Sequence, residues 1–344
     1  MADTAVDFKE VKDVFIAGLS RGMNRKASLQ TALASANLIR KIVVQEKYDN
    51  VDELLAILRD SEQYLSTSLP TELIIRNVFL IAMKLSREEN SRAIHGVDKE
   101  LGNPYDSLNT LWKPEDEAHG DVSAGKKIRK GLIAAVKEVI TEMESSRESI
   151  ICRVFDVVSL NDTVLAYCLD ESPTLLAFLS HARGSIKMRQ VFFASRNEDA
   201  DCIDFASPVP LCEVASKMSD ITKILLPCAA VFPDGACLCP AGSLSIAHSA
   251  ARHAVPVHVV AAFYKIAPYF VADSQQAVLA QRSAGLPVSF SHSYLKNRVI
   301  LSPLFDVIPA NLVSLYISNS GAVLSSHIYR LISDYYHPQD ITDL

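Results

Sequence analysis

Apolar residues recur at helical spacing through the first ninety positions of the chain. The first stripe predicts an amphipathic helix and consists of Leu29, Ala32, Leu33, Ala36, Ile39, Ile42 and Val43. A second helix is predicted to begin after Asn50, because Glu53 follows three residues later in a capping-box-like pattern. The apolar face of this second helix consists of Val51, Leu54, Leu55, Leu58 and Leu65.

Pro70 is predicted to open a third helix, since its missing N–H is not needed in a first helical turn. The apolar face of that helix consists of Ile74, Val78, Ile81 and Leu85. Three amphipathic helices in succession predict a helical bundle. Residues 91–127 break the pattern with repeated glycine and proline, which predicts a long loop or insertion. Helical spacing resumes at Ile128 and predicts a long helix that ends near Ile150.

Beyond residue 150 the pattern changes to short, nearly continuous apolar runs. They occupy 163–169, 190–194, 223–232, 256–263 and 312–317. Helical segments lie between several of these runs, and a last helical repeat follows from Ile328 to Tyr335. Apolar strands that alternate with helices predict a parallel sheet covered on both faces.

The predicted fold class is therefore α/β. An N-terminal helical bundle is expected at 1–150, with its insertion at 91–127. A Rossmann-like, mostly parallel sheet with helices on both faces is expected at 151–344. Residues 271–298 form a second polar insertion in this part of the chain.

Composition narrows the possible functions. The 344 residues carry a formal net charge of −6, so we predict no direct binding of nucleic acid through a broad basic face. No apolar run reaches the roughly 18 residues that cross a bilayer, so we predict no membrane span. The first residues lack a secretory pattern, which predicts a cytosolic protein. A mean hydropathy of +0.15 is high for such a chain and predicts apolar surface buried against other subunits.

The chain carries seven cysteines, an odd number, and most of them lie within apolar runs. Reduced thiols in a cytosolic protein explain them better than a disulfide framework. No Gly-x-Gly-x-x-Gly pattern follows a predicted strand, and no Walker-type loop occurs. Cys237 and Cys239 have the wrong spacing for a zinc knuckle. We therefore predict no cofactor and no bound metal.

Several long segments resemble one known family. They read PTELIIRNVFLIAMKLSREE at 70–89, VFPDGACLCPAGSLSIAHSAARHAVPVHVVAAFYKIAPYF at 231–270, and FDVIPANLVSLYISN with YRLISDYYHP between 305 and 338. Through them the chain resembles the regulatory-subunit family of translation initiation factor 2B, above all its beta-type members. The resemblance covers most of the chain and is weakest at 91–127, 195–222 and 271–298.

The resemblance implies a helical N-terminal domain and a Rossmann-like C-terminal domain. In this family the homologous alpha, beta and delta subunits form the regulatory core of the guanine-nucleotide exchange factor for initiation factor 2, whereas gamma and epsilon subunits hold the exchange chemistry. The expected function is thus a non-catalytic regulatory subunit that scaffolds the complex. It would also sense phosphorylation of the alpha subunit of initiation factor 2, since a phosphate changes the affinity of a docking surface.

The same fold occurs in sugar-phosphate isomerases, whose motifs locate the corresponding pocket in this chain. Its positions are Cys168, Ala229, Asp234, Gly235, Gly242 and Ser243. By this resemblance, Ala229 replaces the proton-shuttling Asp, and Cys239 and Pro240 replace the Asn-Lys pair of the phosphate loop. General acid–base catalysis contributes roughly 10²–10⁴-fold in rate, so we predict a vestigial pocket. Gly242 still lies at a predicted helix N-terminus that an anion could use, and Cys168 is interpreted as a packed strand residue rather than a nucleophile.

A second set of residues is predicted to contact partner proteins. It consists of Glu72, Arg76, Asn77, Tyr329, Tyr335 and Tyr336. The first three lie in the family-like segment at 70–89. The tyrosines fit either a core or the centre of an interface, and both interpretations stay open.

Two further functions stay open beside the regulatory subunit. The first is a sugar-phosphate isomerase that acts on an aldose phosphate through Cys168. The second is an interaction module that has lost both roles, which the divergent region at 195–222 and the two insertions suggest.

Overall fold

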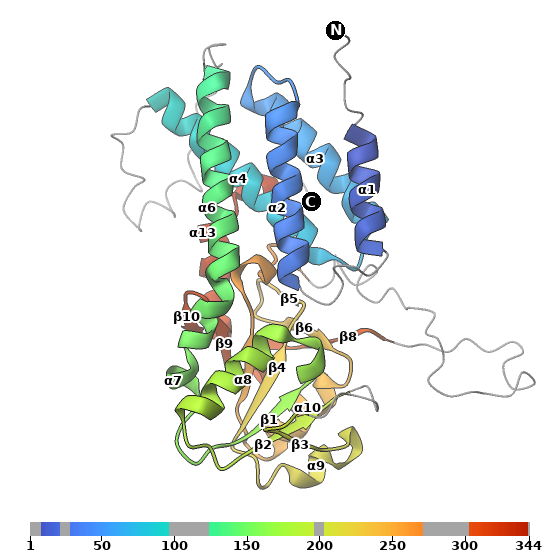
Figure 1. Cartoon of the computed structure of the whole chain (residues 1–344), viewed down its shortest axis with the longest axis vertical. Coiled ribbons are helices and arrows are strands. Elements are labelled where there is room, and N and C mark those ends of the chain that lie inside the picture. Colours follow the sequence, from blue (N-terminus) through green and yellow to red (C-terminus); the bar gives the residue numbers. More distant parts are fainter. Residues whose placement is uncertain (1–7, 21–27, 96–123, 196–202, 271–302, 343–344) are drawn as a thin grey trace, which may run out of the picture. The chain divides into compact units, whose positions relative to one another are not determined.

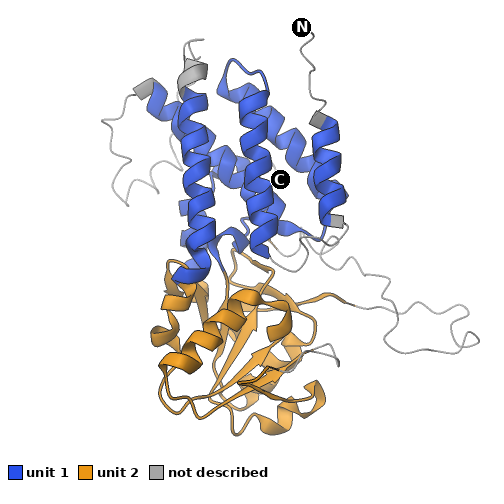
Figure 2. Cartoon of the chain, viewed as in Figure 1, with its two compact units in different colours: residues 1–149, 262–268, 327–344 blue, residues 150–261, 269–326 orange. Residues whose placement is uncertain are grey.

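The computed structural model describes residues 8–20, 28–95, 124–195, 203–270 and 303–342 (Figure 1). The fold is α/β, as predicted, and the chain divides into two compact units (Figure 2). The helical unit comprises 1–149, 262–268 and 327–344, and the sheet unit comprises 150–261 and 269–326. Among the described residues, no helix is both long and apolar enough to cross a membrane.

Amphipathic helices build the helical unit. In chain order they are α1 (Phe8–Ser20), α2 (Ser28–Gln45), α3 (Val51–Ser68), α4 (Leu73–His95) and α6 (Ala124–Cys152), followed late in the chain by η3 (Phe263–Lys265), α13 (Ile328–Tyr335) and α14 (Pro338–Thr342). The predicted apolar stripes on α2 and α3 are confirmed, because residues such as Ile39, Leu54 and Leu58 are almost fully buried. Burial of these stripes is the main term that stabilises the bundle.

The start of α3 is also confirmed. The Asn50 side chain accepts a hydrogen bond from the Glu53 amide at 2.8 Å, and the Glu53 carboxylate accepts one from the Asp49 amide at 2.9 Å. The prediction that Pro70 opens the next helix is wrong by three residues, because a turn at Leu69 precedes Leu73. The predicted loop at 91–127 is wrong at both ends, since α4 continues to 95 and α6 begins at 124. Its remaining part lies outside the described residues.

The sheet unit is built on a seven-stranded sheet of order β10-β9-β7-β4-β1-β2-β3. Its strands are β1 (Thr163–Tyr167), β2 (Gln190–Ala194), β3 (Ser207–Pro208), β4 (Lys223–Pro227), β7 (Val257–Val260), β9 (Leu315–Ser318) and β10 (Gly321–Val323). Only β10 runs antiparallel to its neighbour among these strands. All five residues of β1 are buried, as expected for a central parallel strand. The flanking helices are α7 (Val154–Val157), α8 (Pro173–Ser185), α9 (Val214–Lys217) and α10 (Ser243–Arg252) (Figure 1).

A second, three-stranded sheet has the order β5-β6-β8 and consists of β5 (Ala230–Val231), β6 (Cys237–Pro240) and β8 (Phe305–Ile308). The single strand predicted at 223–232 is therefore two strands. The chain leaves the main sheet after Pro227, and the Ala229 amide donates to the Leu238 carbonyl at 2.7 Å to begin the β5–β6 hairpin. Strands β3, β6, β8 and β10 were not predicted, because two to four residues are too few to show an alternating pattern.

The end of the chain packs with the helices in the helical unit. The Tyr336 hydroxyl donates a hydrogen bond to the Ile266 carbonyl at 2.5 Å, and the Tyr335 ring stacks on Phe263 with centroids 5.2 Å apart. These contacts join 327–344 and 262–268 to the helical unit, whereas the sequence placed both segments in the sheet domain. The boundaries 1–150 and 151–344 stay a prediction for independently folding domains.

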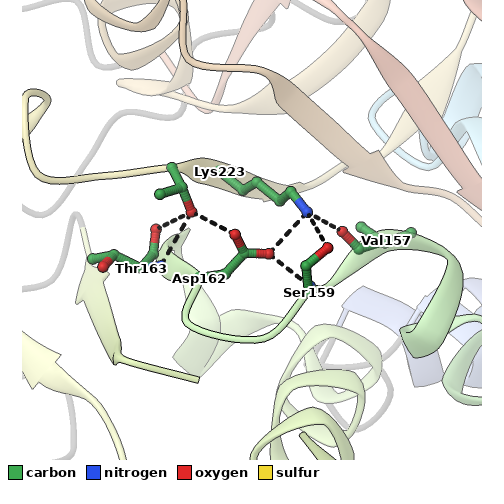
Figure 3. Close-up of polar contacts among 6 residues, drawn as sticks. Val157, Ser159, Asp162, Thr163 and Lys223 are labelled. Carbon is green, nitrogen blue, oxygen red and sulfur yellow. Dashed lines mark hydrogen bonds and ion pairs between the residues drawn. The ribbon is translucent and has the colours of Figure 1, made fainter. Parts of the chain in front are cut away.

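A buried polar network joins the amino ends of β1 and β4 (Figure 3). The Lys223 ammonium lies 2.8 Å from Asp162 and donates to the Val157 carbonyl at 2.6 Å. The Asp162 carboxylate also accepts hydrogen bonds from the Ser159 amide at 2.7 Å and the Thr222 hydroxyl at 3.0 Å. Burial alone would raise the pKa of Asp162, but these hydrogen bonds and the Lys223 charge outweigh burial and lower it.

His258 on β7 is 8% exposed, and its register neighbour on β4 is Leu225. Burial and the nearby Lys223 charge lower the pKa of His258 from 6.5 to about 4, and Asp162 opposes this only in part. The imidazole is therefore neutral in the folded chain at pH 6, whereas an unfolded chain would protonate it. Since the partners of Asp162 and Lys223 are strand ends and connecting loops, we interpret this end of the sheet as structural.

Acidification is expected to destabilise the chain through His258. The unfolded state binds more protons between pH 6.5 and about pH 4, so the free energy of unfolding falls as the pH falls through this window. The loss reaches at most about 3 kcal/mol by pH 4. Urea unfolding between pH 7 and pH 4.5 checks this. His258→Gln should show a flatter pH dependence, and the exposed control His248→Gln should keep the original slope. Equal slopes in both variants would contradict the expectation.

Candidate functional site

The candidate site lies where β1 ends and α10 begins in the sheet unit. Open α/β sheets bind ligands at the carboxyl ends of their strands. The Tyr167 hydroxyl, from the last residue of β1, donates a hydrogen bond to the Ala241 carbonyl. This contact joins the end of β1, which Cys168 follows directly, to the segment that leads into Gly242 and Ser243. The structure thus brings these three predicted pocket residues into one region.

A carboxylate of the chain itself occupies the N-terminus of α10. The Gly242 amide donates to Asp306 Oδ2 at 2.7 Å, and the Leu244 amide donates to the same oxygen at 3.1 Å. Free amides at a helix N-terminus attract anions. Here two of those amides already bind the Asp306 carboxylate, whose negative charge also opposes a phosphate. An external anion at this helix start would therefore have to compete with the Asp306 carboxylate for the same amides.

The register of the small sheet places Asp306 there. Strand β8 pairs with β6 so that Asp306 stands opposite Cys239, and Phe305 stands opposite Pro240. Sequence reasoning did not identify Asp306, although it lies within the family-like segment at 305–319. The two ends of the contact are 64 residues apart in the chain, so no local spacing could reveal it.

Side chains fill the space above Gly242. This glycine has φ +100°, and a Cβ added to it would clash with the Tyr167 hydroxyl and lie 3.2 Å from the Leu211 side chain. Tyr167 is fully buried. A phosphate group approaching this backbone would have to displace the tyrosine ring. The start of α10 at Gly242, called the cradle below, is therefore closed to an external anion by packing as well as by charge.

Cys168 lies in a turn and not in a strand, which corrects the sequence interpretation. Strand β1 ends at Tyr167, and Cys168 has φ +46° and ψ +49°, in the left-handed region that non-glycine residues rarely adopt. Its amide donates to the Ala194 carbonyl at 2.8 Å, and the residue is fully buried, as expected. Because the thiol is buried, external reagents have little access to it.

The other pocket positions serve the backbone. Ala229 contributes an amide to the β5–β6 hairpin and no ionisable group. The exposed Asp234 carboxylate accepts a hydrogen bond from the Ala236 amide at 2.9 Å, which fixes the hairpin turn. Gly235 has φ +78° in that turn, and its carbonyl accepts a hydrogen bond from the Tyr316 hydroxyl at 2.7 Å. These positions support a fold, and a catalytic role for them is not favoured.

Two acidic side chains follow β1 at the same edge of the sheet. Asp170 and Glu171 follow β1 in a short 3-10 helix, and the Ser195 hydroxyl at the end of β2 donates to Asp170 at 3.0 Å. Within the described ranges, no group of three His, Cys, Asp or Glu side chains could hold a metal ion.

The six partner-contact candidates differ in exposure. Asn77 is fully buried and donates to the Tyr264 carbonyl at 3.1 Å, and Tyr336 is 1% exposed. Burial leaves these two side chains no surface to present, which corrects the prediction for Asn77 and favours the core interpretation of Tyr336 over the interface one. Tyr335 is half-buried against Phe263, and Tyr329 is 66% exposed.

The other two candidates, Arg76 and Glu72, are each partly exposed. The Arg76 guanidinium lies 3.4 Å from the Glu62 carboxylate on α3. Together with Tyr335 and Tyr329 they remain predicted contacts, and Tyr329 presents the largest free surface among the six.

Comparison with known proteins points to one group of translation factors. The chain is 25% identical to translation initiation factor eIF2B subunit beta of Schizosaccharomyces pombe, covering 90% of this chain and 91% of that protein. It is 24% identical to the corresponding Dictyostelium discoideum protein, covering 92% of each.

Solved structures agree on the fold. The crystal structure of eIF2B beta from Chaetomium thermophilum matches 98% of this chain and 94% of that chain, with a TM-score of 0.73 at 20% identity. The 5-methylthioribose 1-phosphate isomerase of Pyrococcus horikoshii matches with a TM-score of 0.54 at 14% identity, covering 95% of this chain and 87% of that chain. The fold is therefore shared by subunits and by an enzyme, so fold alone does not assign the chemistry.

Gly242→Ala is expected to destabilise the chain by about 1–3 kcal/mol, because the new methyl group requires a strained φ and collides with Tyr167. The control is Gly184→Ala in α8, where a Cβ meets nothing within 4 Å. That change should be neutral or stabilise by up to about 1 kcal/mol. Urea unfolding at pH 7 measures both, and an unchanged midpoint for Gly242→Ala would show that the cradle is open.

The sequence signature extends through both units. The model of the initiation factor 2 subunit family matches residues 24–196 and 210–325, which is well over half of the chain. The matched ranges include α2 to α4, every strand of the seven-stranded sheet except β3, and the closed segment at Gly242. The chain belongs to the initiation factor 2 subunit family.

Proposed function

We propose that this chain is a beta-type regulatory subunit of eIF2B, the guanine-nucleotide exchange factor for translation initiation factor 2, and that it works in the cytosol. The observation that carries the proposal is the match to beta subunits of two distant eukaryotes over nine-tenths of each protein. Each match extends over nearly the whole of both proteins, so the proposal covers both units of the chain. The fold similarity to eIF2B beta from Chaetomium thermophilum supports the same assignment.

The subunit is proposed to be non-catalytic. Asp306 holds the amides at the start of α10, Tyr167 covers Gly242, and the Cys168 thiol is buried. Ala229 provides no proton acceptor where the isomerases carry an aspartate. Each feature removes a part that sugar-phosphate chemistry requires, namely an anion site, room for the substrate, a nucleophile and a base.

Its partners are proposed to be the homologous delta and alpha subunits, the gamma and epsilon subunits, and the alpha subunit of initiation factor 2. One solved structure that resembles this chain is a tetrameric eIF2B-beta2-delta2 complex from C. thermophilum, with a TM-score of 0.70 at 21% identity, covering 96% of each chain. Regulation would follow from differential binding, since a phosphoserine on the substrate factor changes its affinity for one docking surface.

Co-expression with the delta-type subunit of the same organism is expected to yield a stable complex, because apolar surface left open on each subunit is then covered. Size-exclusion chromatography with light scattering gives the mass of the complex. A pull-down from native extract should recover delta-type and gamma-type subunits. Recovery of neither would refute the proposed function and favour an interaction module with other partners.

Tyr329→Ala is expected to weaken binding to the other subunits by about tenfold, because exposed aromatic residues often dominate interfaces. The matched control is Tyr336→Phe, which removes the hydrogen bond to Ile266 inside the helical unit. The control should lower the thermal midpoint and leave the affinity unchanged. Titration by surface plasmon resonance separates the two. Full affinity in the Tyr329 variant would place the interface elsewhere.

A sugar-phosphate isomerase is the second candidate, and two observations favour it. The fold matches a 5-methylthioribose 1-phosphate isomerase, and Cys168 lies in a left-handed turn directly after β1. This alternative predicts turnover of an aldose 1-phosphate that Cys168→Ser abolishes. We expect no turnover at high protein concentration, since the cradle at Gly242 is closed. Cysteine-dependent turnover above the buffer rate would overturn the non-catalytic assignment.

A further inference from the structure

Two arginines of the helical unit converge on one buried carboxylate. Arg87 on α4 donates to Asp340 through Nη2 at 2.9 Å and through Nε at 3.2 Å. Arg59 on α3 donates to the same carboxylate at 2.9 Å. The Asp340 side chain is only 1% exposed. Three charge-assisted hydrogen bonds therefore surround a single anion.

This geometry is that of an oxyanion receptor. A guanidinium that donates through two nitrogens matches the two oxygens of a carboxylate or a phosphate, and a second arginine adds charge and orientation. Burial alone would raise the pKa of Asp340, but the hydrogen bonds and charge of Arg87, the hydrogen bond of Arg59 and the nearby His337 lower it, so the group is an anion at neutral pH. The pair thus binds a fully ionised ligand supplied by the same chain.

The ligand lies on a short helix. Helix α14 has five residues, too few to be stable by itself. The preceding helix α13 has its own attachments, since Lys84 donates to the carbonyls of Ser333 and Asp334 and Tyr336 bonds to Ile266. Release of α14 therefore does not require α13 to leave.

Solvent reaches the receptor from one side. The Arg59 side chain is 42% exposed, whereas that of Arg87 is 16% exposed. A competing anion can therefore approach Arg59 first and exchange with Asp340 in steps. A receptor buried on all sides would allow no such exchange.

We propose that Arg59 and Arg87 form an anion-binding site and that Asp340 occupies it as an internal ligand. A peptide segment of a partner protein displaces Asp340 and α14 when that segment bears a carboxylate or a phosphate. The site lies on the helical unit and goes beyond the proposed regulatory assignment. Its physical basis is exchange of one oxyanion for another on the same pair of arginines. Helix α14 thereby acts as an autoinhibitory segment that covers the Arg59–Arg87 site.

The test uses the full chain and inorganic phosphate as the probe, with sodium chloride at equal ionic strength as the reference. Asp340→Ala should lower the thermal midpoint, and phosphate should raise it again by roughly 2–4 °C relative to chloride. The intact chain should respond less than Asp340→Ala, because phosphate must first displace Asp340, and the double variant Asp340→Ala with Arg87→Gln should show no specific response to phosphate. An equal response in all three proteins, or none in Asp340→Ala, would overturn the proposal.

Asp340→Asn serves if the alanine variant fails to fold, because the amide keeps the shape and removes the charge. Phosphate should stabilise this variant more than chloride does. In the intact chain, hydrogen–deuterium exchange should speed up at residues 339–341 in phosphate and stay unchanged in chloride. If hydrogen–deuterium exchange at residues 339–341 is the same in both salts and phosphate does not stabilise the Asn variant, the Arg59–Arg87–Asp340 cluster is a structural ion pair only.

Discussion

The carboxylate of Asp306 holds the first amides of α10, and the chemical character of the sheet unit depends on this contact. A helix start at the carboxyl end of a parallel sheet is the place where such folds receive phosphates. In this chain the place is taken by a group that cannot diffuse away. Tyr167 then packs over Gly242, which closes the space that a ligand would need. The Asp306 carboxylate thus occupies the place where related folds bind a phosphate, and its hydrogen bonds stabilise the start of α10.

The amino and carboxyl ends of the parallel strands carry different kinds of polar contact. At the amino ends, Asp162 and Lys223 satisfy each other and several loop groups, so that charged side chains brace the strands (Figure 3). At the carboxyl ends, Asp170 and Glu171 follow β1, and the Asp306 carboxylate holds the first amides of α10. The first arrangement stabilises the fold, and the second places negative charge where a phosphate would bind.

The helical unit uses an internal carboxylate in a comparable way. Asp340 binds Arg59 and Arg87 from the end of the chain, while Tyr335 and Tyr336 pack the preceding helix. Both contacts pair a site that suits anions with an aspartate of the same chain. They differ in attachment, because Asp306 belongs to a strand within a sheet and Asp340 to a five-residue helix that is too short to be stable by itself.

Local pattern determined much of this protein from its sequence. Helical periodicity and the Asn50 cap predicted α2 and α3, and continuous apolar runs predicted β1 and β2, since each signal depends on neighbours within a few residues. The long family-like segments identified the family for the same reason, because they are contiguous in the chain. Cys168 was misplaced in a strand, since a buried turn residue continues an apolar run.

Tertiary structure alone decided the contacts that define the sites. Gly242 and Asp306 are 64 residues apart, and Arg87 and Asp340 are 253 apart. No periodicity links positions so distant, because their proximity follows from strand register and helix packing. Tyr329 and Tyr336 illustrate the same limit, since one is exposed and the other buried although both belong to one tyrosine-rich segment. The chain's pattern fixed which elements form, and the packing of those elements fixed which side chains are left for chemistry or for partners.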